Sequence, residues 1–269
     1  MTRILTPLLL ILALLTAGCA ASSANRPAEL NVFAAASLQE AFTGLAAEFE
    51  AAHPGVEVRL NFAGSQSLRL QIEEGAPVDL FASANPEQMQ ALQQAGLMRP
   101  PVIFTRNRMV VILPATNPAG ITALEELARP GLKLVLANPA VPAGQYARAV
   151  LANLNPTLGV DFSGRVLANL VSEEENVKGV LAKVQLGEAD AGIVYISDVT
   201  PAVKGQLRLI EFPGAANVQA AYPLAVAAHS PAPHLARQFA EFVLSSRGQS
   251  VLAMHGFNPA RLEAVGQQP

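Results

Sequence analysis

Four short segments of the chain have the residue types of an anion-binding loop. Each combines small or hydroxyl-bearing residues with the start of an amphipathic helix: residues 34–40, 63–67, 141–144 and 172–178. The first turn of a helix leaves backbone N–H groups without acceptors, and the helix dipole adds partial positive charge there. Small side chains let a ligand approach such a turn closely. The chemistry that these segments predict is therefore the binding of an anion.

Each segment also has an explanation that needs no ligand. Ser37 begins a Ser-x-x-Glu capping box, and the local sequence alone favours a cap at this position. Ser65 or Ser67 can cap the next helix, which leaves the other hydroxyl free for a ligand. Pro142 suits the first turn of a helix but also a simple loop. The acidic residues 173–175 suit a helix start as partners of its dipole.

Short apolar runs alternate with helical patterns along the chain. Apolar or alternating runs predict strands near residues 30–36, 56–62, 78–83, 109–113, 132–137, 192–196 and 222–228. Helical spacing and helix-start residues predict helices near residues 38–52, 65–74, 86–95, 231–244 and 248–254. The alternation indicates an α/β protein with mostly parallel strands, in which the runs at 109–113, 132–137 and 192–196 suit buried parallel strands.

The amino terminus has the pattern of an export signal. Arg3 precedes an apolar run at residues 8–15, and small residues then lead to the only cysteine of the chain, Cys19. The run is too short for a spanning helix, which needs about 20 apolar residues. We expect residues 1–18 to be a lipoprotein signal peptide, Cys19 to carry the lipid and residues 19–28 to form a tether. The alternative is ordinary cleavage near the same position, with Cys19 removed or left free.

Composition argues against several other functions. The chain has 269 residues, of which 18 are basic and 21 acidic, and a formal net charge of −3 without any run of Lys or Arg. It lacks the basic footprint of a nucleic-acid-binding protein. The four histidines and the single cysteine show no grouping of metal-ligand type, so neither a zinc site nor an internal disulfide is expected. The length suits one large domain or two smaller ones.

Several longer stretches carry a family resemblance. They are VFAAASL at residues 32–38, FAGS at 62–65, EGAPVDLFASA at 74–84, VPAG at 141–144, ENVKGVL at 175–181 and GIVYISD at 192–198. With these stretches in this order, the chain resembles the periplasmic molybdate-binding proteins of bacterial ABC importers over about residues 30–257. Gly64 and Gln66 depart from the serine-rich run that many relatives have in the second ligand loop.

The resemblance implies a two-lobed α/β periplasmic-binding-protein fold of type II. Two crossover strands connect the lobes of such a protein, and the ligand lies in the cleft between them. The expected division is residues 29–108 with 221–258 for lobe 1, residues 109–220 for lobe 2 and residues 259–269 for a C-terminal tail. A ligand that contacts both lobes favours the closed state, which is the signal that the permease reads.

The resemblance also implies a ligand set. The hydroxyls of Ser37, Ser65 and Tyr195 and the backbone N–H groups of Ser37, Ser65, Ala143 and Val177 would hold molybdate or tungstate. These residues would reach the metal only through the oxyanion oxygens, without direct ligation. The implied partners are the oxyanion and an ABC importer permease. The resemblance further implies an extracytoplasmic monomer that needs no cofactor. Such a protein would contact the membrane only through its lipid anchor.

Selectivity follows from the nature of these donors. A fully ionised tetrahedral oxyanion only accepts hydrogen bonds, whereas protonated phosphate also needs an acceptor. Sulfate differs from molybdate mainly in size, so a receptor for another anion such as sulfate stays the alternative. Carboxylate receptors commonly use an arginine clamp, and none of the candidate loops contains Arg.

Two other classes of protein fit the sequence less well. A serine hydrolase would need a nucleophile elbow of the Gly-x-Ser-x-Gly type, which the chain lacks, so enzyme activity is not expected. A ligand-sensing regulator would need a DNA-reading module at the position of the export signal.

Overall fold

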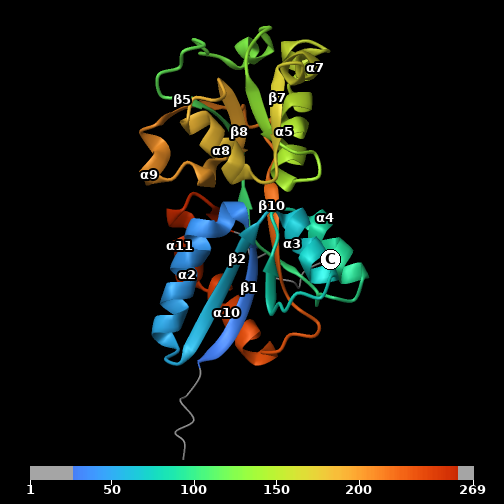
Figure 1. Ribbon diagram of the computed structural model, residues 1–269, viewed down its shortest axis with the longest axis vertical. Coiled ribbons are helices and arrows are strands. Elements are labelled where there is room, and N and C mark those ends of the chain that lie inside the picture. The colour runs from blue at the N-terminus through green and yellow to red at the C-terminus, as the bar shows by residue number, and fades with distance from the viewer. Residues whose placement is uncertain (1–26, 260–269) are drawn as a thin grey trace, which may run out of the picture.

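The structure of the protein is a computed structural model that describes residues 27–259. Two β-sheets, each with helices packed against it, lie one beyond the other along the long axis (Figure 1). Cys19, the expected signal peptide, most of the tether and nearly all of the expected tail lie outside the described residues. Within residues 27–259, no helix has both the length and the apolar character needed to cross a membrane.

The first sheet has six strands in the order β11-β4-β10-β3-β1-β2. The strands are β1 (Ala28–Ala35), β2 (Val56–Ala63), β3 (Leu80–Ala82), β4 (Val102–Asn107), β10 (Ala220–Val226) and β11 (Asn258–Pro259). β1 pairs in parallel with both β2 and β3. β10 runs antiparallel to β3 and β4.

The second sheet has five strands in the order β7-β6-β8-β5-β9. The strands are β5 (Met109–Pro114), β6 (Leu134–Ala137), β7 (Leu170–Glu174), β8 (Ala191–Tyr195) and β9 (Leu207–Glu211). Only Arg108 separates β4 of the first sheet from β5 of the second, and residues 212–219 connect β9 back to β10. The chain therefore crosses between the sheets twice.

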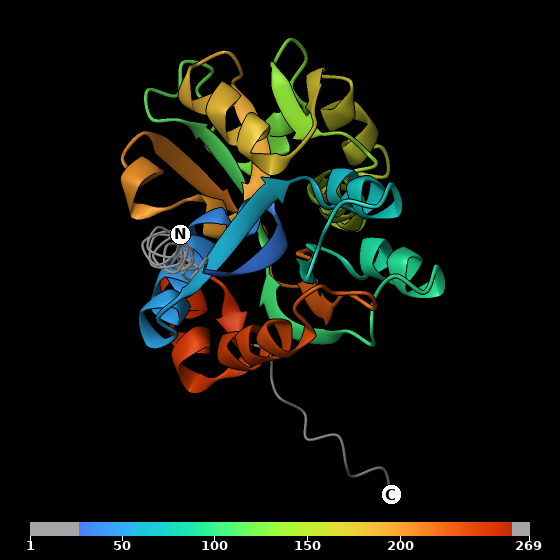
Figure 2. The same cartoon turned by 60° about the horizontal axis from the view of Figure 1, so that its bottom comes forward.

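The helices connect these strands and cover their faces. The α-helices are α2 (Gln39–Ala52), α3 (Ser65–Glu73), α4 (Pro86–Gln94), α5 (Pro142–Asn153), α6 (Asn155–Leu158), α7 (Phe162–Leu167), α8 (Val177–Gln185), α9 (Pro201–Lys204), α10 (Pro233–Leu244) and α11 (Ser246–Met254). The 3-10 helices are η1 (Ala36–Leu38), η2 (Leu124–Ala128) and η3 (Ile196–Asp198). Figure 2 shows α3 and α4 on the side of the first sheet away from α2, α10 and α11.

Apolar spacing in the sequence explains this covering of the first sheet. Phe42, Leu45 and Phe49 recur on one face of α2, and all three are fully buried. The rings of Phe42 and Phe49 meet Phe239 of α10 edge to face, with centroids 6.3 and 5.1 Å apart. The buried apolar residues of α3 and α4, which include Leu68, join a separate cluster on the opposite face. Both faces of the sheet are therefore buried, as parallel strands require.

The expectation that residues 109–113 form a parallel strand is wrong. β5 runs antiparallel to both of its neighbours, β8 and β9. Met109 pairs with Tyr195, so β5 starts at the edge of the sheet where β8 ends. The reason is that β5 continues directly from β4 and enters the second sheet at the edge that faces the first sheet. β6 and β8 run towards that edge and are parallel to each other.

Candidate functional site

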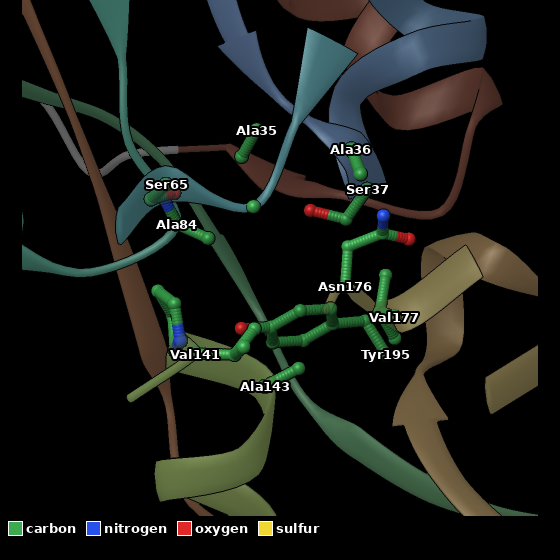
Figure 3. Close-up of a pocket in the computed structure, with 12 residues that line it drawn as sticks. Ala35, Ala36, Ser37, Ser65, Ala84, Val141, Ala143, Asn176, Val177 and Tyr195 are labelled. Carbon is green, nitrogen blue, oxygen red and sulfur yellow. The ribbon is translucent and has the colours of Figure 1, made fainter. Parts of the chain in front are cut away.

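One pocket lies between the two sheets and contains all five residues that the resemblance implied. Ser37 and Ser65 come from the first unit, which is the first sheet with its helices. Ala143, Val177 and Tyr195 come from the second unit, which is the second sheet with its helices (Figure 3). Its remaining lining residues are small or polar: Ala35, Ala36, Gly64, Ala84, Val141, Pro142 and Asn176. Among the described residues, none with a charged side chain lines the pocket. The pocket can therefore hold an anion only through neutral donors.

Helix starts surround the pocket because the parallel strands end there. Ser65 is the first residue of α3, Val177 is the first residue of α8, and Ala143 lies in the first turn of α5 after Pro142. The N–H groups of a first turn have no carbonyl of a preceding turn to bond. Their dipoles converge from both sheets on one space, which is the arrangement that favours an anion.

The capping function that the local sequence favoured for Ser37 is wrong. Residues 36–38 form the 3-10 turn η1, and neither η1 nor α2 has a side-chain cap. Ser37 lies inside this turn rather than before it, so its hydroxyl cannot reach the N–H groups that a cap would bond. Instead, Ser37 Oγ lies 2.9 Å from the hydroxyl of Tyr222 on β10. The side chain is 3% exposed and faces the pocket.

The second loop also has no side-chain cap. Gly64 occupies the cap position of α3, so neither Ser65 nor Ser67 caps the helix. The Oγ of Ser65 accepts a hydrogen bond from the backbone N–H of Ala84 at 3.0 Å. Ala84 follows β3, so this bond ties two strand ends of the first sheet together. The proton of the Ser65 hydroxyl remains available for a ligand.

Tyr195 brings a buried hydroxyl without a partner to the other side of the pocket. The residue is 1% exposed at the end of β8, and within residues 27–259 its hydroxyl oxygen has no hydrogen-bond partner. Burial, together with the neighbouring Tyr222 and Tyr146, raises the pKa of Tyr195 well above its ordinary value. The phenol therefore stays protonated and can donate. A buried polar group without a partner is costly, and a ligand that accepts its hydrogen bond removes that cost.

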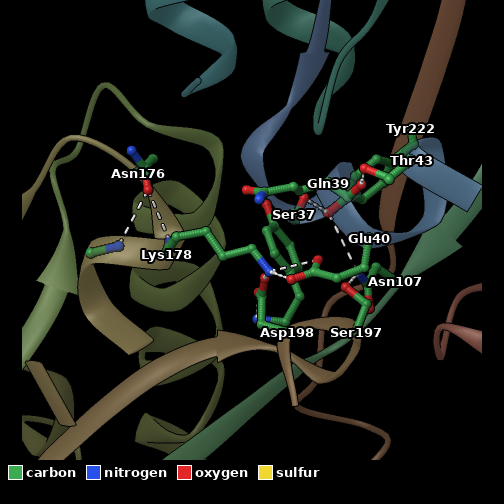
Figure 4. Close-up of polar contacts among 12 residues, drawn as sticks. Ser37, Gln39, Glu40, Thr43, Asn107, Asn176, Lys178, Ser197, Asp198 and Tyr222 are labelled. Atoms are coloured by element: carbon green, nitrogen blue, oxygen red, sulfur yellow. Dashed lines mark hydrogen bonds and ion pairs between the residues drawn. The ribbon is translucent and has the colours of Figure 1, made fainter. Parts of the chain in front are cut away.

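A cluster of charges lies beside the pocket without lining it (Figure 4). Lys178 Nζ lies 2.8 and 2.9 Å from the carboxylate oxygens of Glu40 and 3.3 Å from Asp198 Oδ1. Burial raises the pKa of Asp198 to about 6, although Lys178 and the N–H of Tyr195 act in the opposite direction. Burial lowers the pKa of Lys178, but Asp198 and Glu40 outweigh this effect and raise it above its ordinary value. The cation is thus neutralised by carboxylates of the protein.

Side chains of the two units meet across the cleft. Gln66 Nε2 donates to the backbone oxygen of Glu175 at 3.0 Å, and Asn85 Nδ2 donates to Gln145 Oε1 at 2.9 Å. A Cβ at position 64 would lie 2.6 Å from the same Glu175 oxygen. The glycine and glutamine that depart from the serine-rich run therefore bring this loop into direct contact with the other unit.

The acidic residues 173–175 do not lie in the first turn of α8, where they were expected as partners of its dipole. Residues 170–174 form β7, where Glu173 pairs with Arg148, and Glu174 lies 2.7 Å from Lys183. Asn176 caps the helix, because its Oδ1 accepts from the N–H groups of Lys178 and Gly179. The signal for this cap was an Asn directly before the apolar helical pattern.

Sequence reasoning missed the part of the site that lies in β10. Tyr146, Tyr195 and Tyr222 are the three tyrosines of the chain, and they meet at the cleft. The ring centroid of Tyr195 lies 6.3 Å from that of Tyr146 and 5.7 Å from that of Tyr222. A tyrosine in an otherwise apolar, buried strand was the available signal for Tyr222, since its hydroxyl needs a partner.

Comparisons with known proteins agree with this geometry. A profile for bacterial extracellular solute-binding proteins matches residues 30–258. The molybdate-binding protein ModA of Mycobacterium tuberculosis is 40% identical over 260 residues, which cover 92% of this chain and 95% of that protein.

Two solved structures have the same fold. The substrate binding domain of a putative molybdenum ABC transporter from Clostridium difficile is 33% identical with a TM-score of 0.65, and the match covers 86% of this chain and 99% of that one. The sulfate-binding protein SubI of Mycobacterium tuberculosis has a TM-score of 0.79 at 20% identity over 87% and 88% of the two chains, a likeness that bears on the fold alone. The expected two-lobed type II fold is confirmed. The chain belongs to the bacterial extracellular solute-binding protein family.

Proposed function

We propose that the protein captures molybdate, and also tungstate, in the cleft between its lobes and presents it to an ABC importer permease. The observation that carries the proposal is the buried Tyr195 hydroxyl, which has no partner among the described residues and faces serine hydroxyls across the pocket. Ser37, Ser65 and Tyr195 donate through their hydroxyls. Ser37, Ser65, Ala143 and Val177 donate through backbone N–H groups. The names of the 40% and 33% identical relatives support this choice of ligand.

A neutral all-donor pocket suits a dianion that carries no proton of its own. Molybdate can accept a hydrogen bond from every donor around it, whereas hydrogen phosphate would place its proton against another donor. The pocket lining contains no carboxylate that could accept such a proton. We assign the pocket no catalytic role and no direct metal ligand, because its donors contact only the oxyanion oxygens.

Closure of the lobes completes the site in this proposal. The proposed lobes comprise residues 29–108 with 221–258 and residues 109–220. Apart from one end residue each of β1, β10 and β11, these bounds keep the strands of each sheet in one lobe. Donors from both lobes bond one ligand, so the ligand binds the closed state more tightly than the open state. The bonds from Gln66 to Glu175 and from Asn85 to Gln145 join the two lobes, so we expect them to break when the cleft opens.

The direct test is a thermal-shift panel of oxyanions on the protein without residues 1–18. At a ligand concentration about 100 times Kd, molybdate and tungstate should each raise the melting temperature by about 5–10 °C, since they bind only the folded state. Sulfate should give a much smaller shift, because a smaller anion cannot reach all donors at hydrogen-bonding distance. Phosphate and simple carboxylates should give none.

The panel also separates the alternative function. A sulfate shift as large as the molybdate shift would replace the proposal by a sulfate receptor, for which the fold likeness to SubI is the supporting observation. If neither molybdate nor tungstate shifted the melting temperature, the proposed capture of molybdate would be refuted.

We propose that Cys19 anchors the protein outside the cytoplasmic membrane through a lipid. Residues 20–26, which follow it, are small and polar apart from Arg26, and they suit a tether. Replacing Cys19 with serine should release the protein from the membrane fraction without changing its Kd for molybdate, since the tether precedes the folded residues. Fractionation with mass spectrometry of the mature terminus checks this, and an unmodified wild-type terminus that begins after Cys19 would contradict the anchor.

A further inference from the structure

The Ser37 hydroxyl is the end of a chain of buried hydrogen bonds that starts at Asn107 (Figure 4). Asn107 is fully buried at the end of β4, and Tyr222 is fully buried on β10. The hydroxyl oxygen of Tyr222 lies 3.5 Å from Asn107 Nδ2 and 2.9 Å from Ser37 Oγ. Asn107 and Tyr222 do not line the pocket, and Ser37 is the pocket residue to which the Tyr222 hydroxyl is hydrogen-bonded.

Asn107 fixes the direction of these bonds. Its Oδ1 accepts from the backbone N–H of Arg108 at 2.9 Å, which turns its Nδ2 towards Ser197 and Tyr222. An amide nitrogen only donates, so the Tyr222 oxygen accepts from Asn107 and has its own proton left for Ser37. The pKa of Tyr222 is raised, chiefly by burial, so this proton is always present. Of the two directions open to the bond between Ser37 and Tyr222, the one that uses this proton has Ser37 Oγ as the acceptor.

We infer that Tyr222 and Asn107 are positioning residues that commit the proton of the Ser37 hydroxyl to the bound oxyanion. The inference rests on the proposed function, because the ligand supplies the acceptor for that proton. A serine hydroxyl has one proton and two lone pairs. With a lone pair filled by Tyr222, the hydroxyl keeps its proton free to donate into the pocket.

The second serine of the pocket follows the same rule. Ser65 Oγ accepts from the backbone N–H of Ala84 at 3.0 Å, which leaves its proton for the pocket. Both serines are thus held as donors by groups that lie behind them. Such a pocket favours fully deprotonated tetrahedral oxyanions, because each serine proton needs an acceptor oxygen on the ligand.

A double-mutant cycle tests the inference by titration calorimetry with sodium molybdate. Tyr222→Phe removes only the hydroxyl and should raise Kd about tenfold in the wild-type background. In the Ser37→Ala background the same change should raise Kd by no more than about twofold, since the proton that Tyr222 positions is already gone. A purely structural role of Tyr222 would multiply Kd by the same factor in both backgrounds.

The outcomes of the cycle separate the inference from the proposed function. Equal effects of Tyr222→Phe in the two backgrounds would overturn the positioning role and leave molybdate binding intact. Failure of the wild-type protein to bind molybdate would overturn the proposed function, and the inference with it.

A second pair of variants reverses the chain of bonds without touching Tyr222. Asn107→Asp replaces the donor by an acceptor, so Tyr222 donates to the new carboxylate and Ser37 must donate to Tyr222. Asn107→Leu removes both functions at similar volume. Asn107→Asp should bind molybdate about tenfold more weakly than Asn107→Leu, and most of this difference should vanish in the Ser37→Ala background. A difference that survives there in full would reflect only the added charge and would contradict the inference.

Discussion

Tyr195→Phe is expected to weaken molybdate binding by about 1.5–3 kcal/mol, or roughly 10- to 150-fold in Kd, the scale of a hydrogen bond to a charged group. The hydroxyl has no partner in the described residues, so its removal takes nothing from the ligand-free protein. The free energy of unfolding without ligand should therefore stay unchanged or rise slightly. Titration calorimetry and denaturant unfolding of the same variant measure the two quantities.

Ser250 offers a matched control for the loss of a hydroxyl. Its side chain is exposed on α11 and donates to the carbonyl of Ser246 in the same helix. Ser250 does not line the pocket. Ser250→Ala should change neither Kd nor the unfolding free energy appreciably. If Tyr195→Phe behaved like this control, the phenol would not bond the ligand and the donor set of the second lobe would have to be revised.

The sequence predicted the site loops well because each loop is local. An apolar strand, a small or hydroxyl residue and a helix start lie within a few positions of one another, and their order predicts a helix N-terminus at a strand end. The resemblance then united Ser37, Ser65, Ala143, Val177 and Tyr195, which the structure brings to one pocket. Their binding of an oxyanion is the proposal that the calorimetry tests.

The errors at Ser37 and β5 arise from contacts that are distant in the sequence. Ser37 and Tyr222 are 185 positions apart, so a local pattern cannot reveal that the hydroxyl bonds a tyrosine rather than capping a helix. The direction of β5 depends on its entry from the other sheet, which an apolar run does not encode. Both features concern the passage between the lobes, where β4, β5 and β10 meet.

The charged cluster beside the pocket was missed for a similar reason. The local pattern places Glu40 in a capping box and Lys178 in a helix-start segment, and it does not predict that either lies near Asp198. The pairing of Lys178 with Glu40 spans 138 positions and connects α8 to α2 across the cleft. Lys178 therefore lies beside the pocket, but Glu40 and Asp198 neutralise its positive charge.

Lys178→Met is expected to destabilise the protein in a pH-dependent way. The variant leaves Asp198 fully buried without its cation, and breaking a buried pair in this way costs about 3 kcal/mol at pH 8. The pKa of Asp198 in the folded protein is about 6 against an ordinary 3.8, so the folded state holds a proton that the unfolded chain releases. The contribution of Asp198 to stability therefore falls as pH rises through about 4 to 6, and without Lys178 the fall continues to higher pH.

At pH 5 Asp198 is largely protonated and needs no cation, so the same variant should lose less than about 1 kcal/mol there. Lys183→Met is the matched control on the same helix, since Lys183 pairs with the partly exposed Glu174 at 2.7 Å. The hydrogen bonds from Lys183 and Ser172 outweigh burial and lower the pKa of Glu174, so the control should lose at most about 1 kcal/mol, and equally at both pH values. Denaturant unfolding of both variants at pH 5 and pH 8 decides the matter. An equal loss at the two pH values for Lys178→Met would mean that Asp198 does not depend on Lys178, and the cluster would then act only as a surface ion pair between the lobes.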